Sequence, residues 1–377
     1  MKAKFIALAA LVLGLASCQT DVVDGVKVDA NGEAPVTLQV GLPQDVATRA
    51  AGSDSAKGAI DNGIDLVNAY DIRYILEVYD EEDTLAKRIE QFEPKETQTT
   101  FNLRLVPGRH YRFVVWADFV IQGTEVALHY DASDLTDVKL TDTSDHNPMD
   151  ESRDAYTGVF NTETDGNGKV FSSTSSINIT LTRPFAKYRV VTNDMQELYS
   201  DLATATVKYN TPLYTSFNAL TATPEDLEDN VVKKVDYNTM VYENEADPRA
   251  NGGVQTLFAD YFFGTAAGKV HFTLDVKDKA GFDIPQVAFN TDIPVQRNYL
   301  TTIMGPILTD PNNIIVEIKD GFDGYYNAPV VDTTKALEVA VANAKNGDII
   351  LIDCEVTMPY FTGKELTFVG ISDKAVV

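Results

Sequence analysis

The residue with the clearest chemical role in the sequence is Cys18. It follows the small residues Ala16 and Ser17, and the chain before it has two lysines near its start and an apolar stretch over residues 5–15. A basic start, a short apolar run and small residues before a cysteine are typical of a lipoprotein signal, in which the thiol receives a lipid. The run is too short to cross a bilayer, which takes about 20 residues. We therefore predict a signal peptide at residues 1–17 and an outer-membrane protein that is lipid-anchored through Cys18 and exposed at the cell surface.

Other groups that could do chemistry carry weaker signals. Cys354 lies in an apolar run with no histidine nearby in the sequence to activate it, so a buried strand thiol is expected. Asp142, Asp145, Asp150 and Glu151 could surround a hard cation, but with 56 acidic residues in the chain a solvated loop is the better interpretation. We predict no metal site and no cofactor.

Catalytic motifs are absent from the sequence. There is no G-x-S-x-G, H-E-x-x-H, Walker loop or C-x-x-C. Trp116 and Tyr111 could stack on a sugar, but their apolar neighbours indicate a core strand instead. We predict no catalytic residues and a protein that is not an enzyme.

The composition and net charge of the chain limit the kinds of partner that it can bind. The chain has 377 residues, of which 44% are hydrophobic, and this is enough for two domains with real cores. Its net charge is −25, so its field repels nucleic acid and anionic lipid. We predict no nucleic-acid partner.

The first packed element follows a polar segment. Residues 18–35 are acidic and poor in large apolar side chains, which is typical of a flexible tether. Apolar residues then stand at every second position. This alternation predicts a β-strand with one buried face, formed by Val36, Leu38, Val40 and Leu42.

From there to about residue 325 the chain alternates between short β-type segments and turn residues, and convincing amphipathic helices are nearly absent. Segments 101–105 and 111–116 are expected to pair as a hairpin through Pro107 and Gly108. Regularly spaced short strands predict an all-β fold of antiparallel sandwiches. We place their boundary at Arg183-Pro184, which gives an N-terminal sandwich at 36–183 and a C-terminal sandwich at 184–325. The other predicted strands are 72–79, 177–181, 188–191, 205–209, 269–276, 286–289 and 314–318.

The tail, residues 330–377, has a different pattern. Residues 332–345 predict a capped helix, and two strands follow at 349–354 and 365–369. This order resembles the first coil of a pectate-lyase-like parallel β-helix. One coil cannot bury its own apolar faces, so either further coils follow in a longer protein or the tail packs on the preceding domain.

Several segments together resemble the fimbrillin-like, or Mfa-like, surface lipoproteins, which are subunits of type V pili. The resemblance covers roughly residues 1–325 and implies two tandem transthyretin-like antiparallel β-sandwiches. It is carried by the signal ending at Cys18, the strand and arginine of residues 36–50, the segment Arg183–Asp194, and the segment Ile293–Thr309, with Arg297, Asn298, Thr301, Gly305 and Thr309 in register.

The resemblance also implies an assembly mechanism. In the family an Arg-specific protease is expected to cut after the arginine that follows the first strand, which is here Arg49, leaving Ala50 as the new N-terminus. Loss of the strand Val36–Leu42 exposes an apolar groove, and a neighbouring pilus subunit or another copy of the chain supplies the replacement strand. The simpler alternative is that Arg49 is an ordinary charged loop residue.

The sequence therefore predicts a structural or adhesive surface lipoprotein, a fimbrial subunit. Two alternatives stay open. A glycan-binding lipoprotein would need an exposed platform of aromatic residues, and a polysaccharide-lyase-like enzyme would need further β-helix coils beyond Val377.

Overall fold

The computed structural model describes most of the chain between residues 22 and 370. Cys18, Arg49, Ala50 and Cys354 lie outside the described residues. Strands account for nearly all of the described secondary structure, which confirms the all-β prediction. The described ranges are 22–23, 26–43, 70–94, 96–141, 148–163, 165, 171, 176–194, 202–237, 255–280, 283–320, 330–331, 334–343, 349–352, 355–364 and 366–370.

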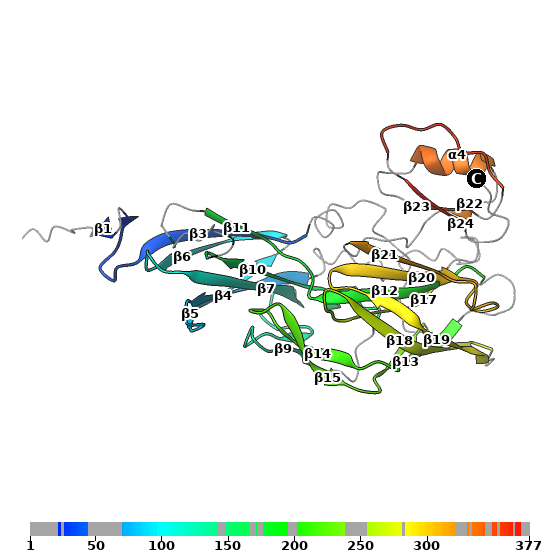
Figure 1. The fold of residues 1–377 in the computed structure, drawn as a ribbon, viewed down its shortest axis with the longest axis horizontal. Coiled ribbons are helices and arrows are strands. Elements are labelled where there is room, and N and C mark those ends of the chain that lie inside the picture. Colours follow the sequence, from blue (N-terminus) through cyan, green and yellow to red (C-terminus); the bar gives the residue numbers. More distant parts are fainter. Residues whose placement is uncertain are drawn as a thin grey trace, which may run out of the picture.

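The N-terminal half is a sandwich of two sheets (Figure 1). One sheet has the order β10-β7-β4-β5 and the other the order β11-β3-β6. Their inward side chains form one apolar cluster, the N-terminal core. The strands are β3 (Ala34–Gly41), β4 (Tyr70–Asp80), β5 (Leu85–Pro94), β6 (Gln98–Leu105), β7 (Tyr111–Ile121), β10 (Ala155–Asn161) and β11 (Ser176–Thr180).

The sandwich closes where β10 approaches β11. Thr157 and Thr182 form a backbone bridge between the two sheets. A Cβ atom on Gly158 would lie 2.8 Å from Cγ2 of Ile179 and 2.9 Å from Cδ2 of Leu181. Glycine is therefore needed at position 158 for the two sheets to approach this closely.

The packed part of the chain begins before residue 36. Two short strands, β1 (Val22–Val23) and β2 (Val26–Lys27), pair with each other, and a turn leads into β3. Val28 and Ala34 have 3% and 0% of their surface exposed and belong to the N-terminal core. The segment expected to be a flexible tether is thus partly built into the sandwich.

The predicted hairpin of residues 101–105 and 111–116 is wrong. Both segments are strands, but β6 lies in the sheet of β3 and β7 in the sheet of β4, so they face each other across the core. The reason lies in burial: β7 is buried on both faces, whereas β6 alternates. A strand buried on both faces needs a packed layer on each side, and β7 has one because Phe113 and Val115 face the N-terminal core while Val114 and Trp116 pack in a second apolar cluster on the other face.

The C-terminal half also pairs two sheets. One has the order β21-β20-β12-β17-β14-β9-β8, with β15 beside β14, and the other has the order β16-β13-β18-β19. The C-terminal core lies between them. The strands are β8 (Tyr130–Asp131), β9 (Val138–Leu140), β12 (Phe185–Thr192), β13 (Leu202–Tyr209), β14 (Leu213–Asn218), β15 (Thr223–Glu228), β16 (Val232–Asp236), β17 (Gln255–Phe263), β18 (Gly268–Asp278), β19 (Asp283–Val295), β20 (Tyr299–Gly305) and β21 (Ile315–Asp320).

Pairing is mostly, but not wholly, antiparallel. β3 pairs in parallel with β11, and β12 pairs in parallel with β20. In the N-terminal half, β3 is the first long strand and β11 is the last strand. In the C-terminal half, β12 is the first long strand and β20 is the next-to-last strand, so each parallel pair joins distant parts of its own half.

The two halves share a third apolar cluster, the junction core. It combines the outer face of β4 and β7, for example Ile75 and Trp116, with Phe185 and Phe263 of the C-terminal sheet. The hairpin β8–β9 comes from the first half of the sequence, yet β9 pairs with β14 of the second. The two sandwiches are therefore joined by both packing and sheet pairing.

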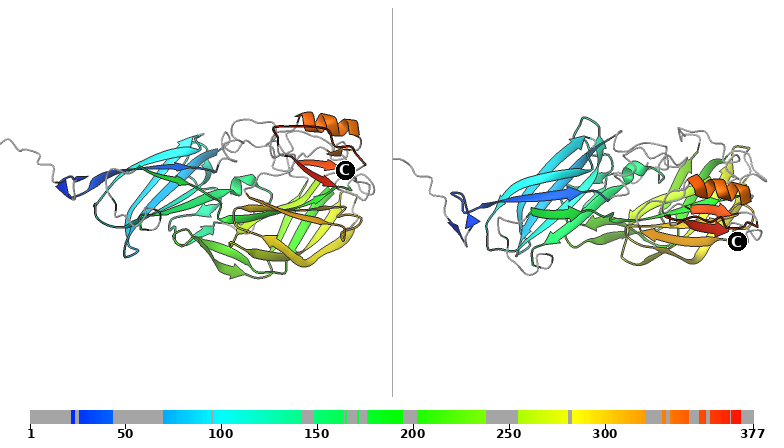
Figure 2. Two further views of the ribbon diagram at one scale, coloured as in Figure 1. Left: turned by 45° about the horizontal axis from the view of Figure 1, so that its top comes forward. Right: turned by 90° about the horizontal axis from the view of Figure 1, so that it is seen from above.

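The tail lies apart from the N-terminal half in both views of Figure 2. Its strands pair in parallel in the order β22-β23-β24, with Val330 opposite Leu351 and Ile349 opposite Thr367. Side chains of the helix and strands form the tail core, which is separate from the other three clusters. The elements are β22 (Val330–Val331), α4 (Thr334–Asn343), β23 (Ile349–Ile352) and β24 (Thr367–Gly370).

Among the described residues, no helix has both the length and the apolar character that a membrane span requires.

Candidate functional site

The candidate exchangeable strand, β3, occupies the middle of its sheet. It pairs antiparallel with β6, which puts Leu38 opposite Phe101, and parallel with β11, which puts Leu38 opposite Ile177. The pairing continues past the strand end, because Leu42 N–H donates to the Thr97 carbonyl at 2.9 Å. β3 is thus a fully paired internal strand although it stands near the start of the described chain.

The four alternating side chains all point into the N-terminal core. Val36, Leu38, Val40 and Leu42 have 2%, 0%, 2% and 7% of their surface exposed. Of the residues between them, Gln39 is exposed, and Thr37 and Gly41 are partly exposed. The structure therefore brings the predicted strand residues together on one buried face.

A charged turn holds the N-terminal end of β3. The Asp29 carboxylate accepts the backbone N–H groups of Asn31 and Glu33 and, at 2.7 Å, the Nε–H of Arg104 on β6. Arg104 also donates to the Glu33 carbonyl at 2.7 Å. Lys87 of β5 reaches the Glu33 carboxylate at 3.0 Å and so bridges the two sheets.

The same contacts lower the pKa of Asp29. The N–H of Glu33 is the largest cause; burial opposes it, and the N–H of Asn31 and the charge of Arg104 add to the lowering. A carboxylate with a lowered pKa adds stability that is present above its unfolded-state pKa and is lost as pH falls through its folded-state pKa. The contacts of the Asp29 carboxylate therefore support the turn at neutral pH, and their contribution falls as Asp29 is protonated in acid.

The other end of β3 lies beside acidic groups. Thr99, opposite Val40, donates to the Glu93 carboxylate of β5 at 2.8 Å. Glu96 directly precedes Thr97, whose carbonyl accepts the hydrogen bond from Leu42. The carbonyl of Glu96 accepts a hydrogen bond from the Tyr74 hydroxyl at 3.2 Å. The carboxylates of Glu93 and Glu96 both act on Tyr74, which lies below β3 in the same core and whose pKa is raised chiefly by burial.

The segment around Arg183 ties the two halves together. Arg183 is fully buried, and its Nε–H donates to both carboxylate oxygens of Asp154 at 2.9 and 2.8 Å. Its backbone N–H donates to the Asn298 side chain at 3.0 Å. Asn298 adopts a φ of 67°, which asparagine tolerates better than most residues. Two motif segments that are far apart in the sequence thus meet at the boundary of the sandwiches.

The remaining motif residues also have structural contacts. The Thr301 hydroxyl donates to the Pro294 carbonyl at 2.6 Å, and Arg297 donates to the Ala222 carbonyl. A Cβ atom on Gly305 would lie 2.3 Å from the Asn313 carbonyl oxygen, which excludes any larger residue without a backbone shift. The backbone N–H and hydroxyl of Thr309 both donate to Asp194 at 2.8 Å.

A buried charge cluster, which the sequence did not reveal, crosses the same boundary. Asp260 of β17 has no exposed surface and bonds Arg153 of the first half at 3.1 Å, Lys233 of β16 at 2.8 Å and the Tyr209 hydroxyl at 2.6 Å. Burial raises the pKa of Tyr209, and the charge of Asp260 raises it further. Burial lowers the pKa of Lys233, and Asp260 partly offsets this lowering. We call this group the Asp260 cluster.

Other candidates give no reaction site. Ser152 Oγ lies 2.8 Å from His129 Nε2, but Ser152 is only 3% exposed. Asp150 accepts a hydrogen bond from Ser152 at 2.7 Å and lies 3.8 Å from the same Nε2 of His129, whereas a catalytic carboxylate would bind the other ring nitrogen. Within the described part of the chain no three His, Cys, Asp or Glu side chains gather as metal ligands; Asp142 and Asp145 lie outside it.

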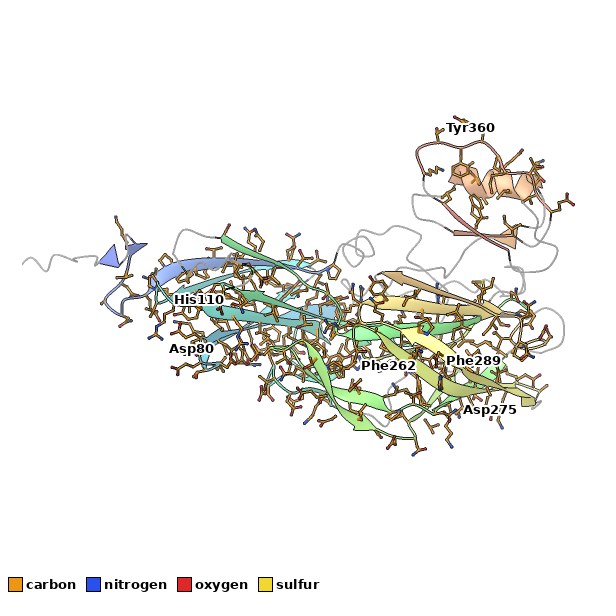
Figure 3. The ribbon with its side chains drawn as sticks, viewed as in Figure 1. Asp80, His110, Phe262, Asp275, Phe289 and Tyr360 are labelled. Atoms are coloured by element: carbon orange, nitrogen blue, oxygen red, sulfur yellow. The ribbon has the colours of Figure 1, made fainter. Side chains whose placement is uncertain are left out.

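Aromatic residues do not form a glycan platform where the sequence suggested one. Trp116 is fully buried in the junction core and Tyr111 is 4% exposed in the N-terminal core. Tyr360, on the outer side of the tail, is 94% exposed (Figure 3).

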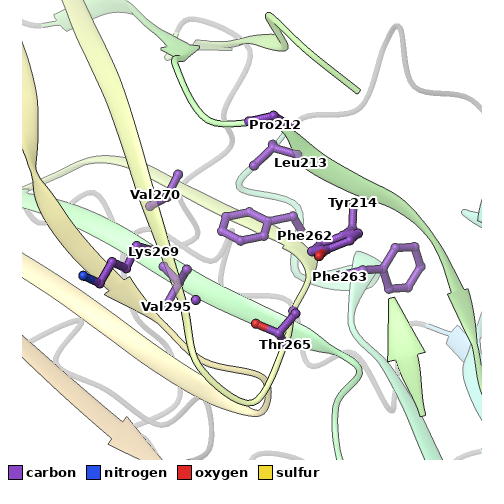
Figure 4. Close-up of a pocket in the computed structure, with 11 residues that line it drawn as sticks. Pro212, Leu213, Tyr214, Phe262, Phe263, Thr265, Lys269, Val270 and Val295 are labelled. Carbon is purple, nitrogen blue, oxygen red and sulfur yellow. The ribbon is translucent and has the colours of Figure 1, made fainter. Parts of the chain in front are cut away.

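A small apolar cavity of about 50 Å³ opens at one corner of the C-terminal sandwich (Figure 4). Its volume suits part of one side chain and not a sugar ring. Leu213, Tyr214, Phe262, Val270 and Val295 are among the residues that line it.

Comparison with known proteins gives distant structural likenesses. A fimbrial assembly protein from Parabacteroides distasonis is 10% identical, with 76% of this chain and 96% of that chain covered and a TM-score of 0.39. The tip fimbrial protein Mfa3 from Porphyromonas gingivalis, truncated at its C-terminus, is 11% identical, with 76% and 98% covered and a TM-score of 0.38. The fimbrial anchor protein Mfa2 from the same organism is 11% identical, with 76% and 98% covered and a TM-score of 0.36.

No curated protein matches the sequence. A family model does match, over residues 28–346, and it is described as a family of unknown function, DUF6562. This range starts at the turn before β3, includes both sandwiches and ends in the tail just after α4. The chain belongs to the DUF6562 family.

Proposed function

We propose that this protein is a structural or adhesive surface lipoprotein, a fimbrial subunit that assembles by removal of β3 and insertion of a donor strand. The observation that supports this most directly is the place of β3. It is an internal strand, its apolar face is buried, and in the sequence it stands between the predicted anchor Cys18 and the predicted cleavage residue Arg49.

Removal of β3 would make the insertion of a replacement strand energetically favourable. The facing edges of β6 and β11 would lose their partners, and unpaired backbone groups in a buried place are costly. Four apolar side chains would leave the core, each contributing about 1.5–3 kcal/mol when fully buried. A donor strand would restore both the backbone hydrogen bonds and the burial of apolar side chains, so an exchanged strand would hold subunits together tightly.

The donor that we propose is the segment Ile314–Ile318 of another copy, most of which forms β21. β21 is at the edge of its sheet, where β20 is its strand partner. Ile315, Val316 and Ile318 are 45%, 39% and 38% exposed. Such an edge strand has fewer contacts to lose than an internal strand and offers apolar side chains to a groove.

Treatment with an Arg-specific protease tests the assembly step. The wild-type protein should be cut at Arg49 and then form oligomers that survive mild detergent, whereas Arg49→Ala should stay monomeric. Mass spectrometry locates the cut and size-exclusion chromatography gives the oligomeric state. A protein that is cut at Arg49 and stays monomeric at high concentration would contradict strand exchange.

The anchor has its own test. Cys18→Ala should move the protein from the detergent phase to the aqueous phase in a phase-partition experiment, because the lipid would be lost. Retention of the variant in the detergent phase at the wild-type level would contradict lipidation at Cys18.

For the tail we infer the start of a parallel β-helix. The support is the in-register parallel pairing of β22, β23 and β24, with α4 packed on them. Stacked parallel coils pair in this manner. The sequence of the complete gene tests this, because further strands at similar spacing should follow.

A further inference from the structure

The place of β3 has opposite charges at its two ends. At the N-terminal end, Arg104 and Lys87 hold the carboxylates of Asp29 and Glu33. At the C-terminal end, Glu93 lies beside Thr99, and Glu96 lies next to the residue that bonds Leu42. Lys87 and Glu93 are both on β5, which runs past β3 and so carries a cation at one end and an anion at the other.

Removal of β3 would change the balance of charges at the N-terminal end of its place in the sheet. Asp29 and Glu33 belong to the chain that leaves after a cut at Arg49, while Arg104 and Lys87 stay with the sandwich. Their side chains are only 42% and 32% exposed even with the partners present. Two half-buried cations would then stand at one end of an apolar groove in a molecule of net charge −25.

We propose that this groove selects its donor strand by a leading charge: an acidic side chain ahead of the alternating apolar residues, at the end of the groove where Asp29 and Glu33 stand in the uncut chain. The proposal rests on the strand-exchange function and adds the chemistry of the partner. Arg104 and Lys87 recognise the leading carboxylate.

A second copy of this chain carries a segment with such a leading acidic side chain. If Ile314, Val316 and Ile318 take the places of Val36, Leu38 and Val40, Asp310 comes to the place of residue 32, between Asp29 and Glu33. In the same register Lys319 takes the place of Gly41, which is opposite Gln98, and Asp320 takes the place of Leu42.

The test uses the full chain with a site-specific protease sequence in place of residues 44–49, so that the cut does not depend on Arg49. A fluorescent peptide of residues 27–43 is added to the cut protein, and its uptake is followed by anisotropy. A second peptide carries Asp29→Asn and Glu33→Gln. The native peptide should bind about 3- to 10-fold more tightly, as two partly exposed ion pairs allow, and the difference should shrink in high salt.

Protein variants assign the preference to the two cations. Lys87→Gln with Arg104→Gln should bind both peptides equally, and Lys87→Gln alone should show about half of the effect on a logarithmic scale. Lys139→Gln, at an exposed lysine that pairs with Asp137, is the matched control and should leave the preference unchanged. Circular dichroism before the cut shows that each variant is folded.

The outcomes separate the two proposals. If neither peptide enters the cut wild-type protein, strand exchange fails as the function. If both peptides enter with equal affinity, or the preference survives in the double variant, exchange stands and selection by the leading charge is wrong.

Discussion

Leu38 lies at the middle of β3 with no exposed surface, and its neighbour Gln39 points to solvent. The alternation of the sequence predicted this difference, because successive strand residues face opposite sides of a sheet. The same rule of alternation did not predict which charged side chains are buried. Lys187, Arg189 and Asp260 have no exposed surface, and no pattern of residue types marks a strand whose polar side chains pair inside the protein.

Leu38→Asp should destabilise the protein much more than Gln39→Asp. A carboxylate at position 38 would be buried without a partner, and even Leu38→Ala is expected to cost about 2–5 kcal/mol. Gln39→Asp, one position along the same strand, should change the free energy of unfolding by less than about 0.5 kcal/mol. Urea unfolding followed by circular dichroism measures both. Equal effects of the two variants would show that β3 is not packed as described.

Asp260→Ala should cost about 3–5 kcal/mol, because Arg153 and Lys233 would stay buried without their shared carboxylate. Tyr209→Phe removes one hydrogen bond to the same carboxylate and should cost about 0.5–2 kcal/mol. The free energy of unfolding in urea distinguishes the two. An Asp260→Ala protein as stable as wild type would mean that the Asp260 cluster contributes no net stability.

At the scale of elements, the predicted segments match 12 of the 24 strands in the described residues, and even long strands such as β5 and β17 were missed. The segments predicted at 72–79, 177–181 and 269–276 are strands in the structure. The turn at Pro107 and Gly108 suggested a hairpin, but pairing depends on which faces of each strand must be covered, and that is decided by the whole sandwich. Short strands such as β8 and β9 carry too few residues for an alternation to be seen.

Deletion of residues 331–377 should leave both sandwiches folded, because the tail core shares no residue with the other clusters of described residues. The melting temperature should shift by less than about 4 °C, which corresponds to about 1 kcal/mol in a chain of this size. Differential scanning fluorimetry of the deleted and full chains makes the comparison. A larger fall would show that the tail is part of the C-terminal sandwich.

For the whole molecule, the boundary that we predicted at Arg183-Pro184 lies in a region where the two halves contact each other. Arg183 is buried against Asp154, β9 pairs with β14, and the junction core includes Trp116 and Phe263. Composition and turn residues indicate where one sandwich ends, but contacts between the halves join residues far apart in the sequence. Such contacts leave no local pattern.

The chain without its tail should therefore unfold in one cooperative transition. The ratio of calorimetric to van't Hoff enthalpy in differential scanning calorimetry should be close to one. Two resolved transitions would show that the sandwiches are thermodynamically independent. Phe263→Ala in the junction core should lower the midpoint without splitting the transition, whereas independent sandwiches would give two peaks.

The position of β3 between two strands also determines how the molecule bears force. A pull on the chain ahead of residue 34 acts along the axis of β3. The backbone hydrogen bonds from β3 to β6 are perpendicular to that axis, and those from β3 to β11 are slanted to it. A pull along the axis therefore loads all of these hydrogen bonds together in shear. A terminal strand pulled sideways would instead open one rung at a time. A force applied from the N-terminal side is thus shared by both rows of hydrogen bonds, and extraction of β3 should need far more force than an opening from the edge of a sheet.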